Sequence, residues 1–261
     1  MLIDSHCHFH LLKNPQTADA ALAEAKANGV THFLNVAIAL EEHEQLCAFS
    51  ARHPEVFASI GLHPCGEGPE PTVVQLVEKA QAPEIVAIGE TGLDYAAGEG
   101  DYQWQEVRFI RHIQAAQQAG LPIIVHSRLA PADTVRVLKA ADAGTVGGVI
   151  HCFVEDTKTA YELLDLGFFL SLSGILTFRN AGELRRTAAK LPIEQLLVET
   201  DCPYLAPVPY RGQENCPQWV WQVVECLADL KKTNPSQIAE QTAENFFRCF
   251  PRAAQRLVSR S

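Results

Sequence analysis

Two histidines near the start of the chain have a type and spacing that could bind a metal ion. His6 and His8 are separated by one residue within residues 2–8, LIDSHCH, a short apolar run typical of a β-strand. Because side chains alternate across a strand, both imidazoles would point to one side and Cys7 to the other. An HxH pair alone also fits a polar strand or a structural histidine in the core. Its role depends on the residues that the fold brings beside it.

Similar ionisable residues stand at the ends of other apolar runs. They are His63, Glu90, His126, His151 and Asp201. Each would cost free energy of desolvation if it were buried without a partner, and a divalent cation is the simplest common partner. We expect six metal ligands, namely His6, His8, Glu90, His126, His151 and Asp201. Mixed imidazole and carboxylate ligands suit Zn, Mn, Ni or Fe, and the carboxylates leave Mg possible. His63 is expected either to contact substrate or to support a ligand.

The runs that carry these residues alternate with longer amphipathic stretches, as in repeated βα units. Eight runs span residues 2–8, 31–37, 56–64, 85–94, 122–128, 147–153, 167–174 and 196–203. Eight parallel strands are the number that an α/β TIM (β/α)8 barrel requires, and 261 residues suit one such barrel. Its catalytic groups lie at the carboxyl ends of the strands, where the ionisable residues fall. We therefore expect a single domain over residues 1–261.

Two of the intervening stretches show helical spacing clearly. They are residues 17–29 and 102–122. In the second stretch, Val107, Ile110 and Ile113 would form the buried face. A Pro-rich loop and two helical stretches follow the eighth run, so the barrel should carry extra C-terminal helices.

The formal net charge of −10 argues against a broad basic surface for duplex nucleic acid. Cations in a metal-lined pocket would still attract a phosphate, so nucleic acid stays open as a substrate. The first residues lack the basic and apolar segments of a signal peptide, and no stretch approaches about 18 consecutive apolar residues. We expect a cytoplasmic protein that does not contact a membrane.

The eight cysteines include no CxxC spacing, which favours free thiols in a reducing compartment over a disulfide framework. Cys152 and Cys202, each next to a proposed ligand, should face the surrounding helices as small apolar side chains. Asp4 and Glu199 lie two residues before a ligand and should share its inward direction as supporting groups. Five other histidines are expected at solvated or helix-surface positions, namely His10, His32, His43, His53 and His112.

Longer motifs identify a family. DSHCH, GLHP, GETGLDY, LPIIVHSR, HCF, SLSGILTFRNA and ETDCPYLAPVPYRG follow in order over essentially the whole chain. The chain resembles the TatD family of metal-dependent hydrolases, and in particular its YcfH-like branch. The resemblance implies an amidohydrolase-like barrel in which His6, His8, Glu90 and Asp201 surround one metal. Glu90 would bridge to a second metal that it shares with His126 and His151.

The resemblance also implies an activity, exonuclease-like hydrolysis of single-stranded DNA. Two cations can share a water and lower its pKa, and Asp201 is our candidate for its proton acceptor, with a purely ligating role as the alternative. Arg128 and Arg211 are nominated for phosphate contacts because their planar forks suit phosphate oxygens. Either arginine could instead form a buried ion pair, for which Asp94 is a possible partner.

The sequence departs from the family at the loops that select substrate. Leu129 stands where many relatives carry Asp, Cys202 replaces a common Ser, and Ala96 and Trp104 are also unusual. Loop changes bear on the substrate more than on the metals. Two alternatives therefore stay open, a hydrolase of a small amide, lactone or phosphoester and a non-catalytic scaffold stabilised by metals. A monomer is expected in each case.

Overall fold

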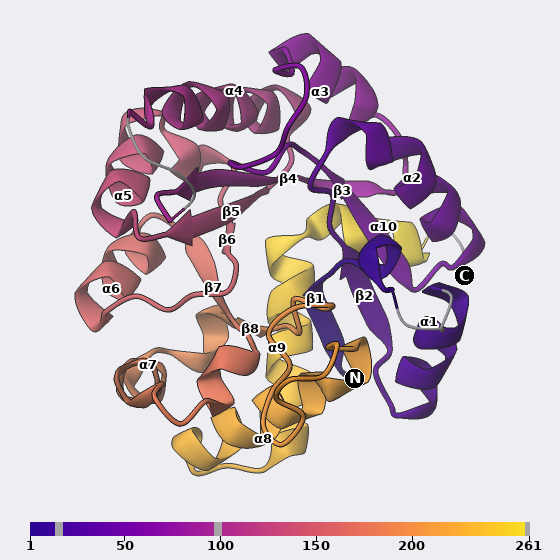
Figure 1. Ribbon diagram of the computed structural model, residues 1–261, viewed down its shortest axis with the longest axis vertical. Coiled ribbons are helices and arrows are strands. Elements are labelled where there is room, and N and C mark those ends of the chain that lie inside the picture. Colours follow the sequence, from indigo (N-terminus) through magenta and orange to yellow (C-terminus); the bar gives the residue numbers. More distant parts are fainter. Residues whose placement is uncertain (14–17, 97–100, 259–261) are drawn as a thin grey trace.

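The computed structural model describes residues 1–13, 18–96 and 101–258 and shows eight parallel strands in sequence order. The strands are β1 Ile3–Cys7, β2 His32–Asn35, β3 Val56–Ile60, β4 Ile85–Asp94, β5 Ile123–Arg128, β6 Gly148–Ile150, β7 Phe168–Leu172 and β8 Leu196–Val198. Together with their helices they form a nearly closed ring, so the predicted TIM barrel is confirmed (Figure 1).

The ring closes where the last strand returns to the first. The amide of Asp201 donates to the carbonyl of His6 over 2.9 Å, and the amide of His8 donates to the carbonyl of Cys202 over 2.9 Å. Below these bonds, Ser5 Oγ donates to the carbonyl of Val198 over 2.9 Å. We call this junction of β1 and β8 the seam.

Ten α-helices are described, and they surround the strands. They are α1 Ala18–Ala27, α2 His43–Arg52, α3 Val73–Lys79, α4 Gln103–Ala119, α5 Pro131–Ala140, α6 Thr157–Asp165, α7 Gly182–Lys190, α8 Val220–Lys231, α9 Pro235–Cys249 and α10 Pro251–Val258. Short 3-10 helices are η1 Phe9–Leu11, η2 Leu40–Glu42, η3 Ala143–Thr145, η4 Gly174–Thr177, η5 Ile193–Gln195 and η6 Pro217–Trp219. None of the helices in the described ranges is long and apolar enough to cross a membrane.

Local sequence accounts for several helix boundaries. Asn234 accepts a hydrogen bond from the amide of Gln237 and Pro235 occupies the first turn, which together begin α9. Gly120 adopts a left-handed φ of 63° and ends α4, as its position in the sequence predicts. Three helices follow β8 rather than the expected two, because Pro251 separates α9 from α10.

The expected boundaries of two helices were close to those observed. The stretch predicted from residue 17 begins as α1 at Ala18, and residue 17 itself lies outside the described residues. The predicted buried face of α4 was partly wrong, because Val107 is 43% exposed although Ile113 is fully buried. Residues 97–100 of the variable loop before α4 also lie outside the described part of the chain.

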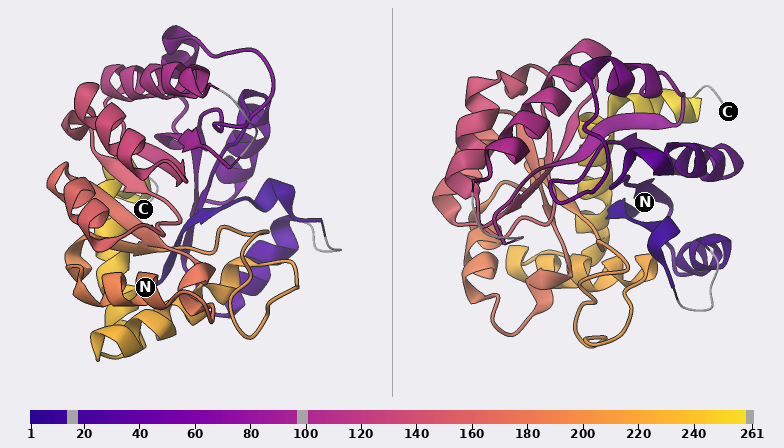
Figure 2. Two further views of the ribbon diagram at one scale, coloured as in Figure 1. Left: turned by 60° about the vertical axis from the view of Figure 1, so that its left-hand side comes forward. Right: turned by 45° about the horizontal axis from the view of Figure 1, so that its top comes forward.

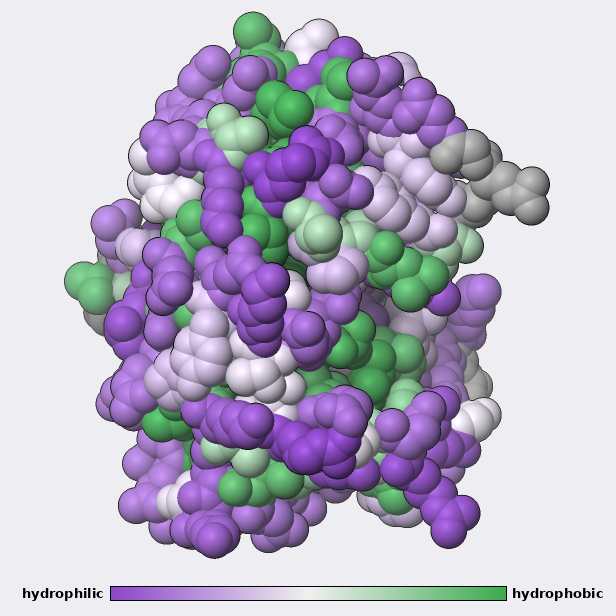
Figure 3. Space-filling model, turned by 90° about the vertical axis from the view of Figure 1, so that its left-hand side faces the viewer, coloured by the Kyte–Doolittle hydropathy of each residue, from purple (hydrophilic) through white to green (hydrophobic). Residues whose placement is uncertain are grey.

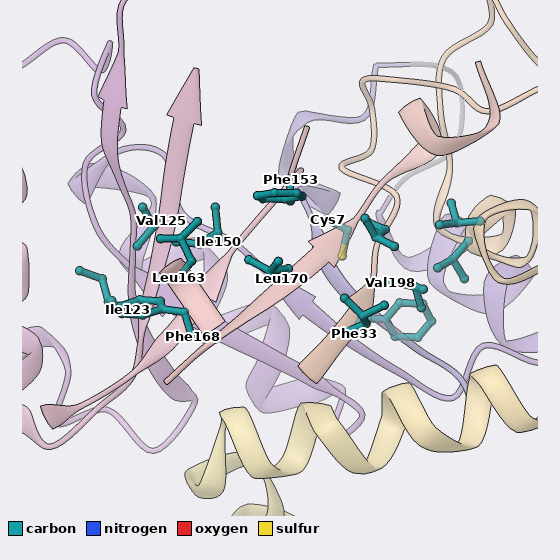
Figure 4. Packing of buried hydrophobic residues seen from close by; sticks show 14 of the residues in the cluster. Cys7, Phe33, Ile123, Val125, Ile150, Phe153, Leu163, Phe168, Leu170 and Val198 are labelled. Carbon is teal, nitrogen blue, oxygen red and sulfur yellow. The ribbon is translucent and has the colours of Figure 1, made fainter. Parts of the chain in front are cut away.

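Two apolar layers hold the barrel together. The outer layer lies between strands and helices, where Val125 and Ile150 pack near Leu163 of α6 (Figure 4). The inner layer fills the amino-terminal end of the ring, and α9 and α10 cover it with Phe246 and Phe250. The outward surface of the flank formed by α5, α6 and α7 is mainly hydrophilic, as expected for the rim of such a barrel (Figure 3).

The loop that follows β8 lies at the opposite, carboxyl-terminal end of the ring. It reaches the segment after β1, where the amide of Lys13 donates to Glu214 Oε1 over 2.7 Å (Figure 2). We call this end of the barrel the mouth and the end covered by α9 and α10 the floor.

Candidate metal centre

Four potential ligand atoms from β1, β4 and the end of β8 meet at the mouth. His6 Nε2 lies 3.2 Å from His8 Nε2 and 3.3 Å from Glu90 Oε2. Asp201 Oδ1 lies 3.4 Å from His8 Nε2 and 3.7 Å from His6 Nε2. Ligands bound at about 2.0–2.2 Å in a tetrahedron are about 3.3–3.6 Å apart. His6, His8 and Glu90 therefore form a group that could hold one divalent cation, and Asp201 lies beside the two histidines of that group.

The other carboxylate oxygen of Glu90 faces a second group of donors. Glu90 Oε1 lies 2.8 Å from His126 Nδ1 and 2.8 Å from His151 Nε2, and these two nitrogens are 3.2 Å apart. Glu90 thus stands between the two groups with one oxygen toward each. Imidazole and carboxylate donors in this arrangement fit divalent first-row cations.

Oxygen acceptors on the far side of the rings orient two of the histidines. His8 Nδ1 donates to the carbonyl of Val36 over 2.8 Å, which leaves the lone pair of Nε2 directed at the first group. His126 Nε2 lies 3.3 Å from Asp94 Oδ2, so its Nδ1 is free for the second group. Metal-binding histidines commonly have such an oxygen partner, because it fixes both tautomer and ring orientation.

Glu199 lies beside a third histidine, on the inward side that the sequence predicts. Its Oε1 lies 3.4 Å from His151 Nδ1 and accepts a 2.7 Å hydrogen bond from the amide of Cys152. The buried Nδ1 atoms of His6 and His151 both lack a hydrogen-bond partner among the residues described. The ring of His6 stacks on that of His151 with 4.0 Å between centroids.

The charges of the site favour ionised carboxylates. Burial alone would raise the pKa of Glu90, but the nearby His151 and His63 lower it well below its usual value. Burial likewise opposes ionisation of Asp201, yet the neighbouring imidazoles of His8, His6 and His151 lower its pKa. A divalent cation would therefore meet two carboxylates that are already deprotonated.

Backbone features bring these ligands together. Gly92 has a φ of 142°, and a Cβ atom there would overlap the carbonyl of His126, so glycine allows β4 and β5 to approach beside Glu90. Asp201 adopts a left-handed φ of 59°, while its amide is bonded to His6 at the seam. The conformation that aims this carboxylate at the histidine pair is therefore fixed by barrel closure.

A cavity of about 400 Å³ opens beside the ligands. Its lining residues are His126, Ser127, Arg128, His151, Cys152, Val154, Ile175, Asp201, Tyr204 and Leu205. The side chain of Arg128 is 65% exposed, and its Nη1 is 3.9 Å from Asp94 Oδ2. Arg128 is therefore available to a ligand in the cavity and does not form a buried ion pair.

Arg211 lies elsewhere. Its guanidinium stands 3.7 Å over the ring of Phe178 and donates to the carbonyl of Ala206 over 2.8 Å. Of the residues described, it is not one that lines the cavity. The structure therefore places Arg128, but not Arg211, next to the ligand atoms.

His63 contacts Glu90 and lies with Glu90 and His126 in a third group whose atoms are close enough to hold a cation. Burial lowers the pKa of His63 to about 4, so the ring is neutral. Its Nδ1 accepts a 3.0 Å hydrogen bond from the amide of Cys65, which puts the proton on Nε2. That nitrogen is 3.5 Å from Glu90 Oε1 and faces it as a donor. His63 is thus placed beside the proposed ligand Glu90, where support of that ligand and contact with substrate both stay predictions.

Comparison with known proteins decides the family. The profile of the family described as TatD related DNase matches residues 3–251. The chain belongs to the TatD family. It is 43% identical over 261 residues to the Escherichia coli K12 protein named uncharacterized metal-dependent hydrolase YcfH, with 99% of this chain and 98% of the relative covered. The predicted resemblance to TatD and YcfH is confirmed.

Two further relatives extend this result. The uncharacterized metal-dependent hydrolase YabD of Bacillus subtilis 168 is 34% identical over 252 residues, covering 96% of this chain and 99% of YabD. The crystal structure of YjjV, a TatD homolog from Escherichia coli K12, superposes with a TM-score of 0.84 at 29% identity, covering 96% and 98% of the two chains. This TatD-family chain is accordingly a metal-dependent hydrolase.

One supporting residue of this TatD protein was mispredicted. The pairing of β1 with β2 shifts register between Asp4 and Cys7, so Asp4 does not share the direction of His6. Its carboxylate instead lies beside the thiols of Cys7 and Cys202 and accepts hydrogen bonds from the amide and hydroxyl of Thr200. Burial raises the pKa of Asp4 to about 8. Asp4 therefore stabilises the seam on the side away from the histidines.

The expectations for two cysteines had opposite outcomes. Cys202 is buried beside Cys7, away from the ligands, as predicted. Cys152 does not face the helices but lines the cavity, with its Sγ 3.2 Å from Ser173 Oγ. The reason is that β6 ends at Ile150, so strand alternation no longer applies at residue 152. All eight cysteines are free thiols.

Helix α4 of the TatD barrel holds the mouth through polar side chains that sequence reasoning missed. The side-chain amide of Gln105 accepts a hydrogen bond from the backbone amide of Asp94 over 2.8 Å. It also donates one to the backbone carbonyl of Asp94 over 3.1 Å. Arg108 donates to three carbonyls within residues 63–66. Both residues are buried on the same stripe as Phe109. Their helical spacing from Phe109 is the signal that could have revealed them.

His112 lies on that stripe too, and its predicted surface position was wrong. It is fully buried, its Nε2 accepts from the amide of Leu62 over 3.0 Å, and its Nδ1 donates to the carbonyl of Arg108 over 2.8 Å. His10 is also largely buried, with its Nε2 3.2 Å from Glu42 Oε2. Both histidines support loops that border the site.

Proposed function

We propose that this protein is an exonuclease-like deoxyribonuclease that uses two divalent cations to hydrolyse phosphodiester bonds at the ends of single-stranded DNA. The observation that carries the proposal is the divided carboxylate of Glu90, whose Oε2 faces His6 and whose Oε1 faces His126 and His151. The family description, TatD related DNase, supports DNA as the substrate class. Zn, Mn, Mg and Ni are the cations that we would test first.

The residues of the mouth would have different roles in the reaction. Cations bound there would activate a water and offset charge on the attacked phosphate. Asp201 is the proton acceptor, because it is ionised and lines the cavity with its side chain 12% exposed. It would pass the proton to the leaving oxygen. Arg128 would orient the phosphate from the rim, whereas Arg211 would have to leave Phe178 to do so.

The position of the ligand atoms favours a chain end over a duplex. His6 and Glu90 are almost fully buried behind a cavity of about 400 Å³. A single-stranded end can enter such a recess more readily than an intact helix. The net charge of −10 also disfavours extended contact with a duplex backbone. We further propose a monomer in the cytoplasm, where free thiols are stable.

The test uses end-labelled single-stranded and duplex DNA with chelated enzyme reloaded with each cation in turn. We expect release of mononucleotides from the single strand, and severe loss of activity in Asp201→Asn and Glu90→Gln. Glu162→Gln, an exposed change on α6, is the matched control. Intact single-stranded DNA with all four cations would contradict the nuclease assignment.

A cavity of this size also falls in the range of small-molecule sites. A second candidate is therefore a hydrolase of a small amide, lactone or phosphoester. It would be favoured if bis(p-nitrophenyl) phosphate, p-nitrophenyl acetate or a lactone were cleaved while DNA stayed intact. A folded Glu90→Ala variant with unchanged activity on every substrate would instead favour the scaffold.

A further inference from the structure

The cavity of about 400 Å³ beside the ligand atoms has one aromatic and apolar wall, although carboxylate and imidazole side chains form its base. Tyr204, Leu205 and Ile175 share the lining with His126 and Asp201. Tyr204 is 54% exposed, and its ring centroid lies 6.4 Å from that of His8. A large aromatic ring that the core does not bury, beside proposed metal ligands, is available to a bound molecule.

The backbone beneath this ring is fixed. The amide of Tyr204 donates to the carbonyl of Asp201 over 2.9 Å. The fully buried side chain of Asn215 donates to the carbonyls of Tyr204 and Thr200 over 2.6 Å and 2.8 Å. The Cα of Tyr204 is therefore held at a constant distance from the ligands, so that no backbone ordering is needed when a substrate packs on the ring.

The apolar residues behind Tyr204 are held just as firmly. Leu205 adopts a left-handed φ of 57°, and its carbonyl packs so closely on Gly174 that a Cβ atom there would overlap it. The amide of Val208 donates to Thr177 Oγ1 over 2.9 Å, which ties the loop to η4. Because η4 also carries Ile175, the loop and η4 form one continuous wall.

We propose that Tyr204 is a substrate-positioning residue on which the nucleobase next to the scissile phosphodiester stacks, with Leu205 and Ile175 bordering that base. The inference rests on the proposed function. A phosphate held between Arg128 and the ligand atoms leaves its neighbouring base at the apolar wall. Every base offers a π-face, so this subsite selects unstacked nucleotides with little preference among the four bases. It makes a single-stranded end, rather than a compact phosphoester, the substrate that fits.

The test compares an oligothymidylate with two versions that carry an abasic residue, one at the 3′ end and one at the 5′ end. Tyr204→Ala should raise KM for the intact oligonucleotide about tenfold. For the oligonucleotide that lacks the base at the attacked end, KM of Tyr204→Ala should stay within twofold of the wild-type KM. The kcat of Tyr204→Ala should change little. Tyr204→Phe keeps the ring and should restore the wild-type KM.

Tyr161→Ala is the matched control, because Tyr161 is 43% exposed on α6 and does not line the cavity. Equal effects of Tyr204→Ala on intact and abasic oligonucleotides, or no effect on either, would overturn the stacking role alone. Failure of the wild-type enzyme to cleave any of the oligonucleotides would overturn the proposed function as well. Thermal unfolding of each variant shows whether a loss reflects folding.

Discussion

The floor and the mouth of the barrel are built from the same strands but filled by opposite kinds of side chain. At the floor, Ile3, Leu34 and Ile124 pack on Phe246 and Phe250. At the mouth, the strands end in imidazoles and carboxylates within 4 Å of one another. Apolar burial stabilises the folded chain, whereas clustered polar groups need a ligand to compensate for desolvation. Apolar packing at the floor therefore stabilises the fold, and the polar groups at the mouth supply the chemistry.

Backbone conformation separates the two ends as well. Six non-glycine residues in the described ranges have a positive φ, and four of them lie at the mouth. These four are Leu129, Cys152, Asp201 and Leu205. Left-handed conformations cost L-residues about 1–2 kcal/mol each. The mouth therefore holds strain that packing elsewhere in the barrel must offset.

The largest effect is expected at Glu90, because both ligand groups share its carboxylate. Glu90→Gln should lower kcat/KM by roughly 10³-fold or more, since metals contribute several kcal/mol to transition-state stabilisation. The unfolding midpoint of the metal-free variant should stay close to that of metal-free wild type. Retention of more than a tenth of the activity would break the assignment of this residue as the shared ligand.

The matching change at the floor is Phe246→Ala. Phe246 is fully buried against Phe57 and Phe250, so its removal should lower the free energy of unfolding by about 3–5 kcal/mol. Specific activity well below the unfolding transition should be unchanged. Denaturant unfolding and initial rates measure the two quantities, and Phe246→Leu offers a milder version if the alanine variant does not fold. A change in the metal affinity of Phe246→Ala would show that the floor and the mouth of the barrel are coupled.

Buried His112 makes stability depend on pH. Burial lowers its pKa to about 4, against 6.5 for an exposed histidine. Between these values the unfolded chain binds a proton that the folded chain excludes, so stability is complete above pH 6.5 and falls as pH decreases toward 4. The loss should be about 3 kcal/mol. Urea unfolding of the chelated protein should show a flatter pH profile for His112→Gln, and parallel profiles would contradict this role.

A smaller effect is expected from Glu199, which lies beside Nδ1 of His151, whereas Nε2 of the same ring faces the second ligand group. Glu199→Gln should weaken metal binding by about 10–100-fold while leaving the fold intact. Metal titration followed by calorimetry measures the change. Glu183→Gln on α7, whose partner is Arg186, is a control that should leave the affinity unchanged.

The smallest effect concerns strain at the mouth. Leu129 is 72% exposed with a φ of 55°, so Leu129→Gly should stabilise the protein by about 0.5–1 kcal/mol. The same replacement at exposed Val107, inside α4, should destabilise by a few tenths of a kcal/mol to about 1 kcal/mol. Denaturant unfolding measures the change in the free energy of unfolding for each variant. Opposite signs would support backbone strain at the mouth, and destabilisation at both positions would contradict it.

The candidate ligands were predictable because six of the eight apolar runs carry an ionisable residue in their carboxyl-terminal part, as Glu90 and His126 illustrate. Prediction by strand alternation failed where local geometry departs from a regular strand. A register shift turns Asp4 away from the ligands, and the early end of β6 leaves Cys152 in the cavity. The burial of His112 was missed although its helical spacing from Phe109 places it on the buried stripe, whereas its partner Leu62 lies 50 residues away in the chain. Such long-range partners are not visible in local patterns.

The seam has a consequence for biosynthesis. The histidine pair is made well before the last strand, while Asp4 and Thr200, which meet at the seam, are 196 positions apart. A chain emerging from the ribosome therefore carries two imidazoles long before the carboxylate of Asp201 exists. Products truncated before residue 201 would keep the pair but lack this carboxylate, so we expect tight metal binding only in chains that have closed the barrel.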